Sequence, residues 1–166
     1  MLSEPKIAQK SEQPYIGIRG SVRMGGIGDF IDGSFPELFA LLEARGVEPA
    51  GPPFLRYNLI DMDRELEIET GVPVDAAILG EGRVFSGILP AGRYGSLVYT
   101  GDYEGLIDAN EALQQWARDR DVEWAMSETA EGDRFESRLE IYLTDPATEP
   151  DPARWKTEVA YLLADD

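Results

Sequence analysis

The chain contains no cysteine and no histidine among its 166 residues. Without cysteine it cannot form disulfides, use a thiol nucleophile, or hold an iron–sulfur cluster or zinc through thiolates. Without histidine it lacks the commonest transition-metal ligand and the usual general base near neutral pH. A Ser–His–Asp or Cys–His mechanism is therefore excluded, and we expect no metal and no cofactor. Any acid–base chemistry must use carboxylates, tyrosine, lysine or water.

Basic residues and long apolar runs are also scarce. The chain has 15 Lys and Arg residues against 32 Asp and Glu residues, a formal net charge of −17. Nucleic-acid binding needs clustered lysine and arginine, so we expect no direct contact with nucleic acid. The negative charge would attract a cationic organic ligand or a basic protein partner. The alternative is that it serves only to keep the protein soluble. No stretch approaches the roughly 20 apolar residues that span a bilayer, and Met1 to Lys6 are not a signal segment, so we expect a cytoplasmic protein that binds no membrane.

The order of the predicted elements indicates the organisation of the chain. With 43% hydrophobic residues, it can fill a real core as one domain over residues 1–166. Apolar residues alternate in some segments and recur every three or four positions in others, which separates strands from helices. The first half reads as a strand at 15–20, a helix at 29–45, and strands at 54–60 and 66–70. This β-α-β-β order defines a first repeat over about residues 5–75.

The second half has the same order over about residues 83–164, with strands at 84–89 and 94–99, a helix at 106–122, and strands at 135–143 and 157–163. We therefore expect an α+β fold. Two β-α-β-β repeats with pseudo-twofold symmetry would form an antiparallel sheet with two main helices and a groove between the repeats, where a ligand could bind. Smaller expectations concern the loops and ends: a frayed or edge segment at 1–12, a cap at Ser34 with Pro36 in the first turn of the helix, an acidic turn at 61–63, an acidic loop at 127–133, and a charged tail at 165–166.

Several segments resemble the GyrI-like family of small-molecule-binding domains. They are Leu66-Glu67-Ile68-Glu69-Thr70-Gly71-Val72-Pro73-Val74, Pro90-Ala91-Gly92-Arg93-Tyr94, Leu97 to Leu106, Leu139 to Pro146, and Trp155 to Val159. The resemblance covers roughly residues 5–164 and implies two β-α-β-β repeats. It also implies a groove that holds hydrophobic, often cationic, compounds with a buried glutamate and aromatic side chains.

Relatives of this kind serve as effector-binding parts of AraC-type and multidrug-responsive regulators. Some standalone members are similar to gyrase-inhibitory proteins, and others hydrolyse cyclopropane-bearing DNA-alkylating natural products. This chain shows no helix-turn-helix, so we expect a standalone domain. It also has Tyr99 where many relatives have histidine before Thr-Gly, so a histidine-dependent activity is not expected to carry over.

Glu140 is the foremost candidate for the site. Period-two alternation places Glu136, Arg138, Glu140 and Tyr142 on one face of their strand and Leu139 on the other. That polar face either is solvated, with Glu140 paired to Arg138 or a neighbouring strand, or lines the groove. In a groove, desolvation would raise the pKa of the carboxyl unless a cation lies beside it, and the site would favour a cationic ligand.

Aromatic residues would complete such a site, and a second carboxylate is a weaker candidate. The candidate walls are Tyr57, Tyr99, Tyr142, Phe39 and Trp116. Phe39 and Trp116 also lie at helical spacing with leucines, so core packing is an alternative for both. Glu69 is a further candidate ligand-binding residue, and together with Glu158 it ends corresponding strands of the repeats. Such a pair could serve acid–base hydrolysis, or it could be a coincidence in a chain rich in carboxylates.

Three functions are compatible with these residues. The leading one is a module that binds a lipophilic or cationic small molecule. The second is a hydrolase in which Glu140 acts with a tyrosine, Tyr57 or Tyr99, on a strained electrophile. The third is inhibition of a topoisomerase through the acidic surface. The identity of the ligand and the oligomeric state stay open.

Overall fold

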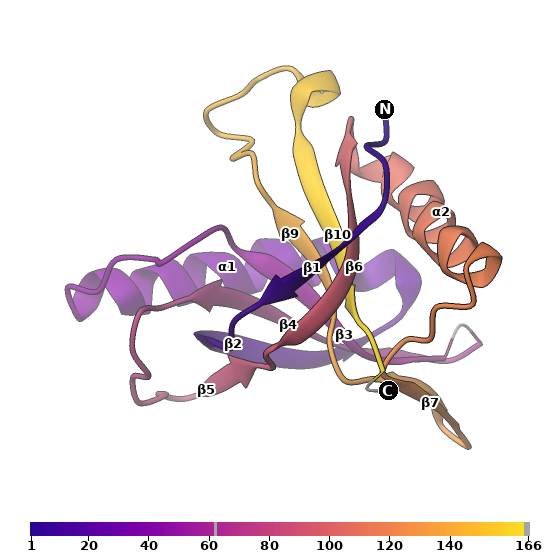
Figure 1. Cartoon of the computed structure of the whole chain (residues 1–166). Helices are drawn as coiled ribbons and strands as arrows, with labels where there is room; N and C mark the ends of the chain where they lie inside the picture. The colour runs from indigo at the N-terminus through magenta and orange to yellow at the C-terminus, as the bar shows by residue number, and fades with distance from the viewer. Residues whose placement is uncertain (62, 165–166) are drawn as a thin grey trace.

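A single antiparallel sheet of ten strands carries two α-helices in the computed structural model, which describes residues 1–61 and 63–164 (Figure 1). Met62, in the predicted acidic turn, and the predicted tail Asp165-Asp166 lie outside the described residues. The α+β prediction is confirmed. The elements are β1 (Lys6–Lys10), β2 (Gln13–Val22), η1 (Met24–Gly26), α1 (Ile27–Ala44), β3 (Phe54–Ile60), β4 (Leu66–Pro73), β5 (Val84–Leu89), β6 (Gly92–Thr100), η2 (Tyr103–Gly105), α2 (Leu106–Asp119), β7 (Met126–Thr129), β8 (Gly132–Phe135), β9 (Arg138–Tyr142), η3 (Pro152–Arg154) and β10 (Lys156–Leu162).

The strand order reveals the predicted repeat. The main path of the sheet is β1-β6-β10-β9-β3-β4-β2-β5. One β-α-β-β unit supplies β2, β4 and β3, the other supplies β6, β10 and β9, and the two units meet where β3 pairs with β9. The strand before each unit crosses to the other one: β1 pairs with β6, and β5 pairs with β2. This exchange ties the two repeats together at both edges of the sheet.

Both helices cover the same face of the sheet. Across the strands, register aligns one row of neighbouring side chains on this face: Leu97, Val159, Glu140, Leu55, Thr70 and Ile18. Helix α2 packs over the Leu97 and Val159 end of the row, and α1 packs over the Ile18 end. The middle of the row, on β9 and β3, therefore lies between the two helices.

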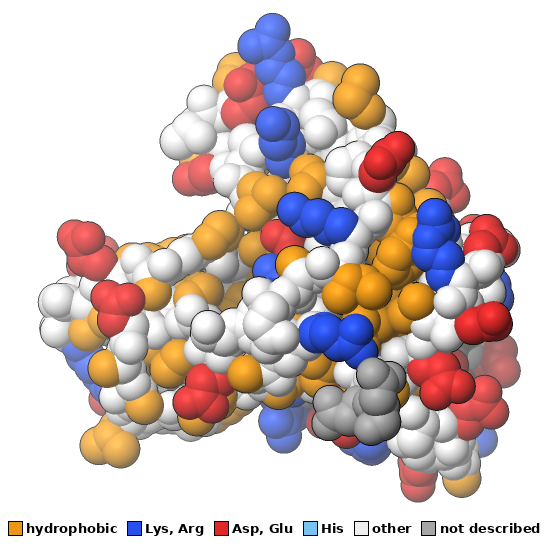
Figure 2. Space-filling model, viewed as in Figure 1, with side chains coloured by type: hydrophobic (Ala, Val, Ile, Leu, Met, Phe, Trp, Pro, Cys, Tyr) orange, Lys and Arg blue, Asp and Glu red, His pale blue; other side chains and the backbone are white. Residues whose placement is uncertain are grey.

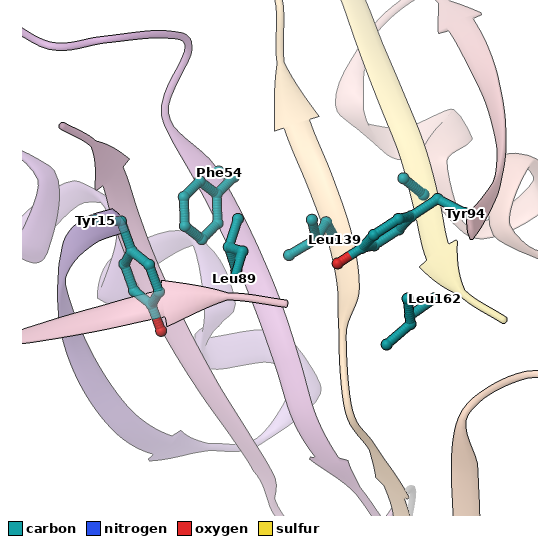
Figure 3. Packing of buried hydrophobic residues seen from close by; sticks show 7 residues of the cluster. Tyr15, Phe54, Leu89, Tyr94, Leu139 and Leu162 are labelled. Carbon is teal, nitrogen blue, oxygen red and sulfur yellow. The ribbon is translucent and has the colours of Figure 1, made fainter. Parts of the chain in front are cut away.

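The opposite face has its own hydrophobic core. Figure 3 shows Tyr15 and Phe54 from the first repeat and Tyr94 and Leu139 from the second, with Leu89 from the crossing strand β5. Each of these side chains is at most 8% exposed. Full burial of a side chain of this size contributes roughly 1.5–3 kcal/mol, so this cluster holds the two halves together.

Three local expectations were wrong or incomplete. Residues 127–133 are not an acidic loop, because β7 and β8 form a hairpin there; short polar strands carry too few apolar residues to show alternation. The first helix begins at Ile27, and Pro36 lies inside it rather than in its first turn. Ser34 is no cap: its hydroxyl is buried, donates to the Phe30 carbonyl oxygen at 2.7 Å and accepts from Thr70 at 2.8 Å. The expected edge segment within residues 1–12 is confirmed, because β1 pairs with β6 at one edge of the sheet.

Candidate functional site

A groove of about 1190 Å³ lies between the two helices above β3 and β9. Ligand sites for drug-sized molecules occupy roughly 300–1,000 Å³, so the groove can admit a molecule of this class. Helix α1 supplies one wall and α2 the other, while the central strands supply the floor. Its lining includes Phe35 and Phe39 of α1, Ile107 and Asn110 of α2, and Tyr57, Arg138, Glu140 and Tyr142 of the strands.

Glu140 lies on the floor of this groove because of the alternation in β9. Arg138, Glu140 and Tyr142 all line the groove, and Leu139 points to the core on the other face. Glu140 is only 5% exposed. Burial of a carboxylate is costly unless hydrogen bonds and charges compensate it, so its partners decide its state.

The Glu140 carboxylate has protein partners on both oxygens. Asn110 donates from Nδ2 to Oε2 at 3.0 Å, and Tyr142 donates from its hydroxyl to Oε1 at 3.4 Å. Burial raises the pKa of Glu140, whereas the Asn110 bond, the Arg138 charge, and the Tyr57 and Tyr142 phenols act to lower it. Burial prevails, so a positive charge brought beside this carboxyl would be stabilised.

Hydrogen bonds fix the Asn110 side chain as well as the Glu140 carboxylate to which it donates. Its Nδ2 also donates to the Leu106 carbonyl oxygen at 2.8 Å, and its Oδ1 accepts from the Tyr161 hydroxyl at 2.5 Å. Asn110 was not predicted as a site residue, although its position in the sequence indicates a buried polar side chain. Asn110 falls at helical spacing among Leu106, Leu113 and other buried residues of α2, and a polar side chain on an apolar helix face needs a partner in the core.

The two phenols beside Glu140 are donors and not bases. Burial, followed by the charge of Glu140, raises the pKa of Tyr57 and of Tyr142 well above the ordinary value. Both therefore stay protonated at neutral pH. A protonated phenol can stabilise the carboxylate or a ligand oxygen, but it cannot accept a proton as a phenolate would.

Arg138 fills the aromatic space next to the carboxylate. Its guanidinium carbon lies 5.3 Å from the ring centroid of Tyr57, 4.8 Å from that of Phe135 and 4.6 Å from that of Tyr161. Burial raises the pKa of Tyr161, and the Arg138 charge opposes this. The floor of the groove thus already contains one cation among aromatic rings.

The mouth of the groove is apolar and open to solvent. Phe39 is 39% exposed, Ile107 is 65% exposed and Leu143 is 41% exposed. Deeper in, Phe35 meets the Tyr142 ring edge-on at 6.3 Å, and Tyr103 meets it at 5.5 Å. Exposed apolar side chains that gather round a concavity mark a binding surface more often than a bare structural surface.

Two of the predicted aromatic walls lie elsewhere. Tyr99 shares the cluster of Leu97 under α2, and its ring passes so close to Gly101 and Gly105 that a Cβ on Gly105 would lie 2.0 Å from the hydroxyl. Trp116 packs in the same cluster, with the Arg120 guanidinium 5.4 Å from its ring. Neither residue is among those that line the groove. Phe39, Tyr57 and Tyr142 are brought together there.

Glu69 lies on the other face of the sheet, because β4 places it opposite Thr70 and Ile68. It borders a second pocket of about 800 Å³ and accepts hydrogen bonds from Tyr15, from Asn58 at 2.6 Å and from Arg19 at 3.3 Å. Glu158 also lies away from the groove and pairs with Lys10 at 2.9 Å. The two carboxylates are engaged with separate partners.

Two absences concern the part of the chain that the structure describes, residues 1–61 and 63–164. Within it, no group of three or more Asp and Glu side chains is placed to hold a metal ion. No helix of that part is long and apolar enough to cross a bilayer. Acidic side chains lie mostly round the edge of the face in Figure 2, with hydrophobic ones nearer its middle.

Comparison with known proteins agrees with this geometry. The family model of the GyrI-like small molecule binding domain matches residues 3–162. No curated protein sequence matches the chain significantly. The solved C-terminal domain of EcmrR superposes with a TM-score of 0.79 at 19% identity, covering 98% of both chains. The chain spans 58% of the EcmrR chain solved in complex with DNA.

Two further solved structures share the fold at lower identity. SAV2435 bound to tetraphenylphosphonium has a TM-score of 0.65 at 11% identity, over 98% of this chain and 94% of that one. A hydrolase from Listeria innocua has a TM-score of 0.63 at 12% identity, over 97% of this chain and 92% of that one.

Proposed function

Because this chain belongs to the GyrI-like family of small-molecule-binding domains, we propose that the groove between α1 and α2 binds hydrophobic, cationic small molecules. Glu140 is the charge partner, and Phe39, Tyr57 and Tyr142 are aromatic contacts. One observation carries the proposal: a carboxylate that is 5% exposed forms the floor of an apolar groove of about 1190 Å³.

The chemistry of the floor favours a cation. Burial destabilises the ionised form of Glu140 and so raises its pKa. A positive charge that approaches the carboxylate stabilises this ionised form, because it offsets the lost hydration. Aromatic faces add about 0.5–2 kcal/mol for each ring that a cation contacts. The exposed apolar mouth would cover the hydrophobic part of the same ligand. The proposed role is that of an effector- or drug-binding protein in the cytoplasm.

Two relatives support this class of ligand and role. SAV2435 was solved with tetraphenylphosphonium, a lipophilic cation, and EcmrR was solved in complex with DNA. Both share the fold at less than 20% identity. This chain is similar to the C-terminal domain of EcmrR.

Titration calorimetry with tetraphenylphosphonium tests the proposal. We expect saturable binding to the wild-type protein and a loss of about 30-fold or more in Glu140→Gln, because removing one side of a buried charge pair costs about 2 kcal/mol or more. Glu69→Gln is the matched control, since it removes an equally buried carboxylate on the other face of the sheet. Absence of saturable binding to the folded wild-type protein contradicts the proposal.

A hydrolase is the second candidate, and the raised pKa of Glu140 beside the Tyr57 phenol favours it. A carboxyl can act as a general base without histidine, with the phenol as a donor. Tyr99, the other tyrosine considered for this role, lies outside the groove lining. Incubation with a cyclopropane-bearing alkylating agent decides the matter. Turnover that is lost in Glu140→Ala establishes hydrolysis, whereas stoichiometric binding without product excludes it.

A further inference from the structure

The Arg138 guanidinium lies among aromatic rings near Glu140, in surroundings of the kind that a cationic ligand would need. Its guanidinium carbon lies within 5.3 Å of three ring centroids, and its charge lowers the pKa of Glu140 against the effect of burial. A cation beside a carboxylate and over aromatic faces has the contacts that characterise recognition of organic cations. Here the ring contacts are made by a side chain of the protein itself, and its charge acts on Glu140.

The hydrogen bonds of Arg138 are poorer than its ring contacts. Its Nη2 reaches Asn110 Oδ1 only at 3.5 Å, and its Nε is buried without a hydrogen-bond partner. A buried donor without a partner is costly. The guanidinium is therefore held by the rings and by the charge of Glu140, and not by a saturated set of hydrogen bonds. Removing or displacing the guanidinium therefore breaks few strong hydrogen bonds.

We propose that Arg138 is a specificity-determining residue, a resident cation that competes with ligand cations for Glu140 and the surrounding rings. The inference rests on the proposed function and deepens it. A ligand cation must either displace the guanidinium or share one carboxylate with it, and two positive charges near a single carboxylate repel each other. A neutral ligand of the same shape meets no such repulsion, and a ligand oxygen could accept a hydrogen bond from Arg138.

This competition sets which compounds the groove selects. With Arg138 in place, the floor is close to electrically neutral, so weakly lipophilic cations gain little there. Only a cation with enough apolar surface to fill the mouth around Phe39 and Ile107 would bind well. Neutral compounds with an acceptor oxygen would also bind. Without Arg138, the same groove would present an unpaired buried carboxylate and would favour cations in general.

The test compares two ligands of similar shape and different charge, methyltriphenylphosphonium and neutral triphenylphosphine oxide. Affinities are measured by calorimetry at pH 8, which favours the ionised form of Glu140 in every variant. In Arg138→Gln we expect the phosphonium to bind about tenfold more tightly, while the phosphine oxide binds equally well or more weakly. Arg138→Lys keeps the charge and should return the preference toward that of the wild type. Arg154→Gln, an exposed residue outside the groove, removes the same charge and should change neither affinity.

The outcomes separate this inference from the function on which it rests. Equal weakening of both ligands in Arg138→Gln, with unchanged melting temperature, overturns the resident-cation role and makes Arg138 a structural residue. If Arg138→Gln does not fold, Arg138→Met preserves the apolar stem over the rings and answers the same question. If neither ligand binds to the wild type or to any folded variant, the proposed function itself fails. If the affinity for the phosphonium falls in Glu140→Gln but does not rise in Arg138→Gln, this inference is overturned and the proposed function stands.

Discussion

The side chain of Asn110 links α2 to the groove floor, because it bonds to both Glu140 and Tyr161. Asn110→Leu keeps a similar volume but removes the donor to Glu140 at 3.0 Å and the acceptor for Tyr161 at 2.5 Å. Each buried group left without a partner costs about 1–3 kcal/mol. Two such groups cost about 2–6 kcal/mol. A buried leucine regains roughly 1 kcal/mol by its apolar surface, so we expect a net loss of about 1–5 kcal/mol.

Thermal unfolding measures this loss. For a domain of this size, each kcal/mol shifts the melting temperature by about 2–4 °C, so Asn110→Leu should melt roughly 2–20 °C below the wild type. Gln115→Leu is the control, since Gln115 is exposed on the same helix and bonds only to neighbouring helix side chains. It should stay within about 0.5 kcal/mol of the wild type. A stability loss below about 1 kcal/mol in Asn110→Leu would refute the linkage described above.

The pH dependence of the same variant provides a second check. The Asn110 bond lowers the pKa of Glu140, so its loss raises that pKa further above the value of an unfolded chain. A carboxyl with a raised folded pKa binds more protons in the folded than in the unfolded state, so stability falls as pH rises between the two values. The destabilisation should therefore be larger at pH 7–8 than near the ordinary glutamate pKa of about 4.3. A penalty independent of pH would contradict the assigned hydrogen bond.

Three further predictions concern the groove and its support. Affinity for tetraphenylphosphonium should fall as pH drops through the raised pKa of Glu140, with a midpoint above that of a free glutamate; a calorimetric pH series measures it, and a flat profile argues against the carboxylate. Phe39→Ser should weaken binding about two- to fivefold with little change in melting temperature, because Phe39 is 39% exposed. Gly71→Ala should destabilise by about 1–3 kcal/mol in urea unfolding, because the new Cβ would lie 2.3 Å from the Phe54 ring.

Much of the fold could be read from the sequence because local patterns encode it. Strands β3 and β5 begin and end where alternation predicts, and the β-α-β-β order is present twice. The exchange of β1 and β5 between the repeats could not be read, because long-range pairing leaves no periodic trace in the sequence. The hairpin of β7 and β8 was missed for lack of apolar residues.

The site residues could likewise be predicted only as far as local alternation determines them. Alternation in β9 placed Arg138, Glu140 and Tyr142 on one face, but it could not say whether helices would border that face. Alternation in β4 likewise could not tell that the face carrying Glu69 lies away from the helices. Tyr99 faces the helix side, yet it lies under α2 and not in the gap between the helices. Inhibition of a topoisomerase stays a prediction, and a supercoiling assay with excess protein would test it.

A crystal structure with tetraphenylarsonium tests the central claim most directly. Arsenic gives an anomalous signal that locates the cation independently of the protein. We expect the arsenic between α1 and α2, with its phenyl groups against Phe39, Tyr57 or Tyr142 and within about 6 Å of their ring centroids. The nearest carboxylate should be that of Glu140. Arsenic in the pocket beside Glu69, or on an outer surface with the groove unfilled, would contradict the assignment.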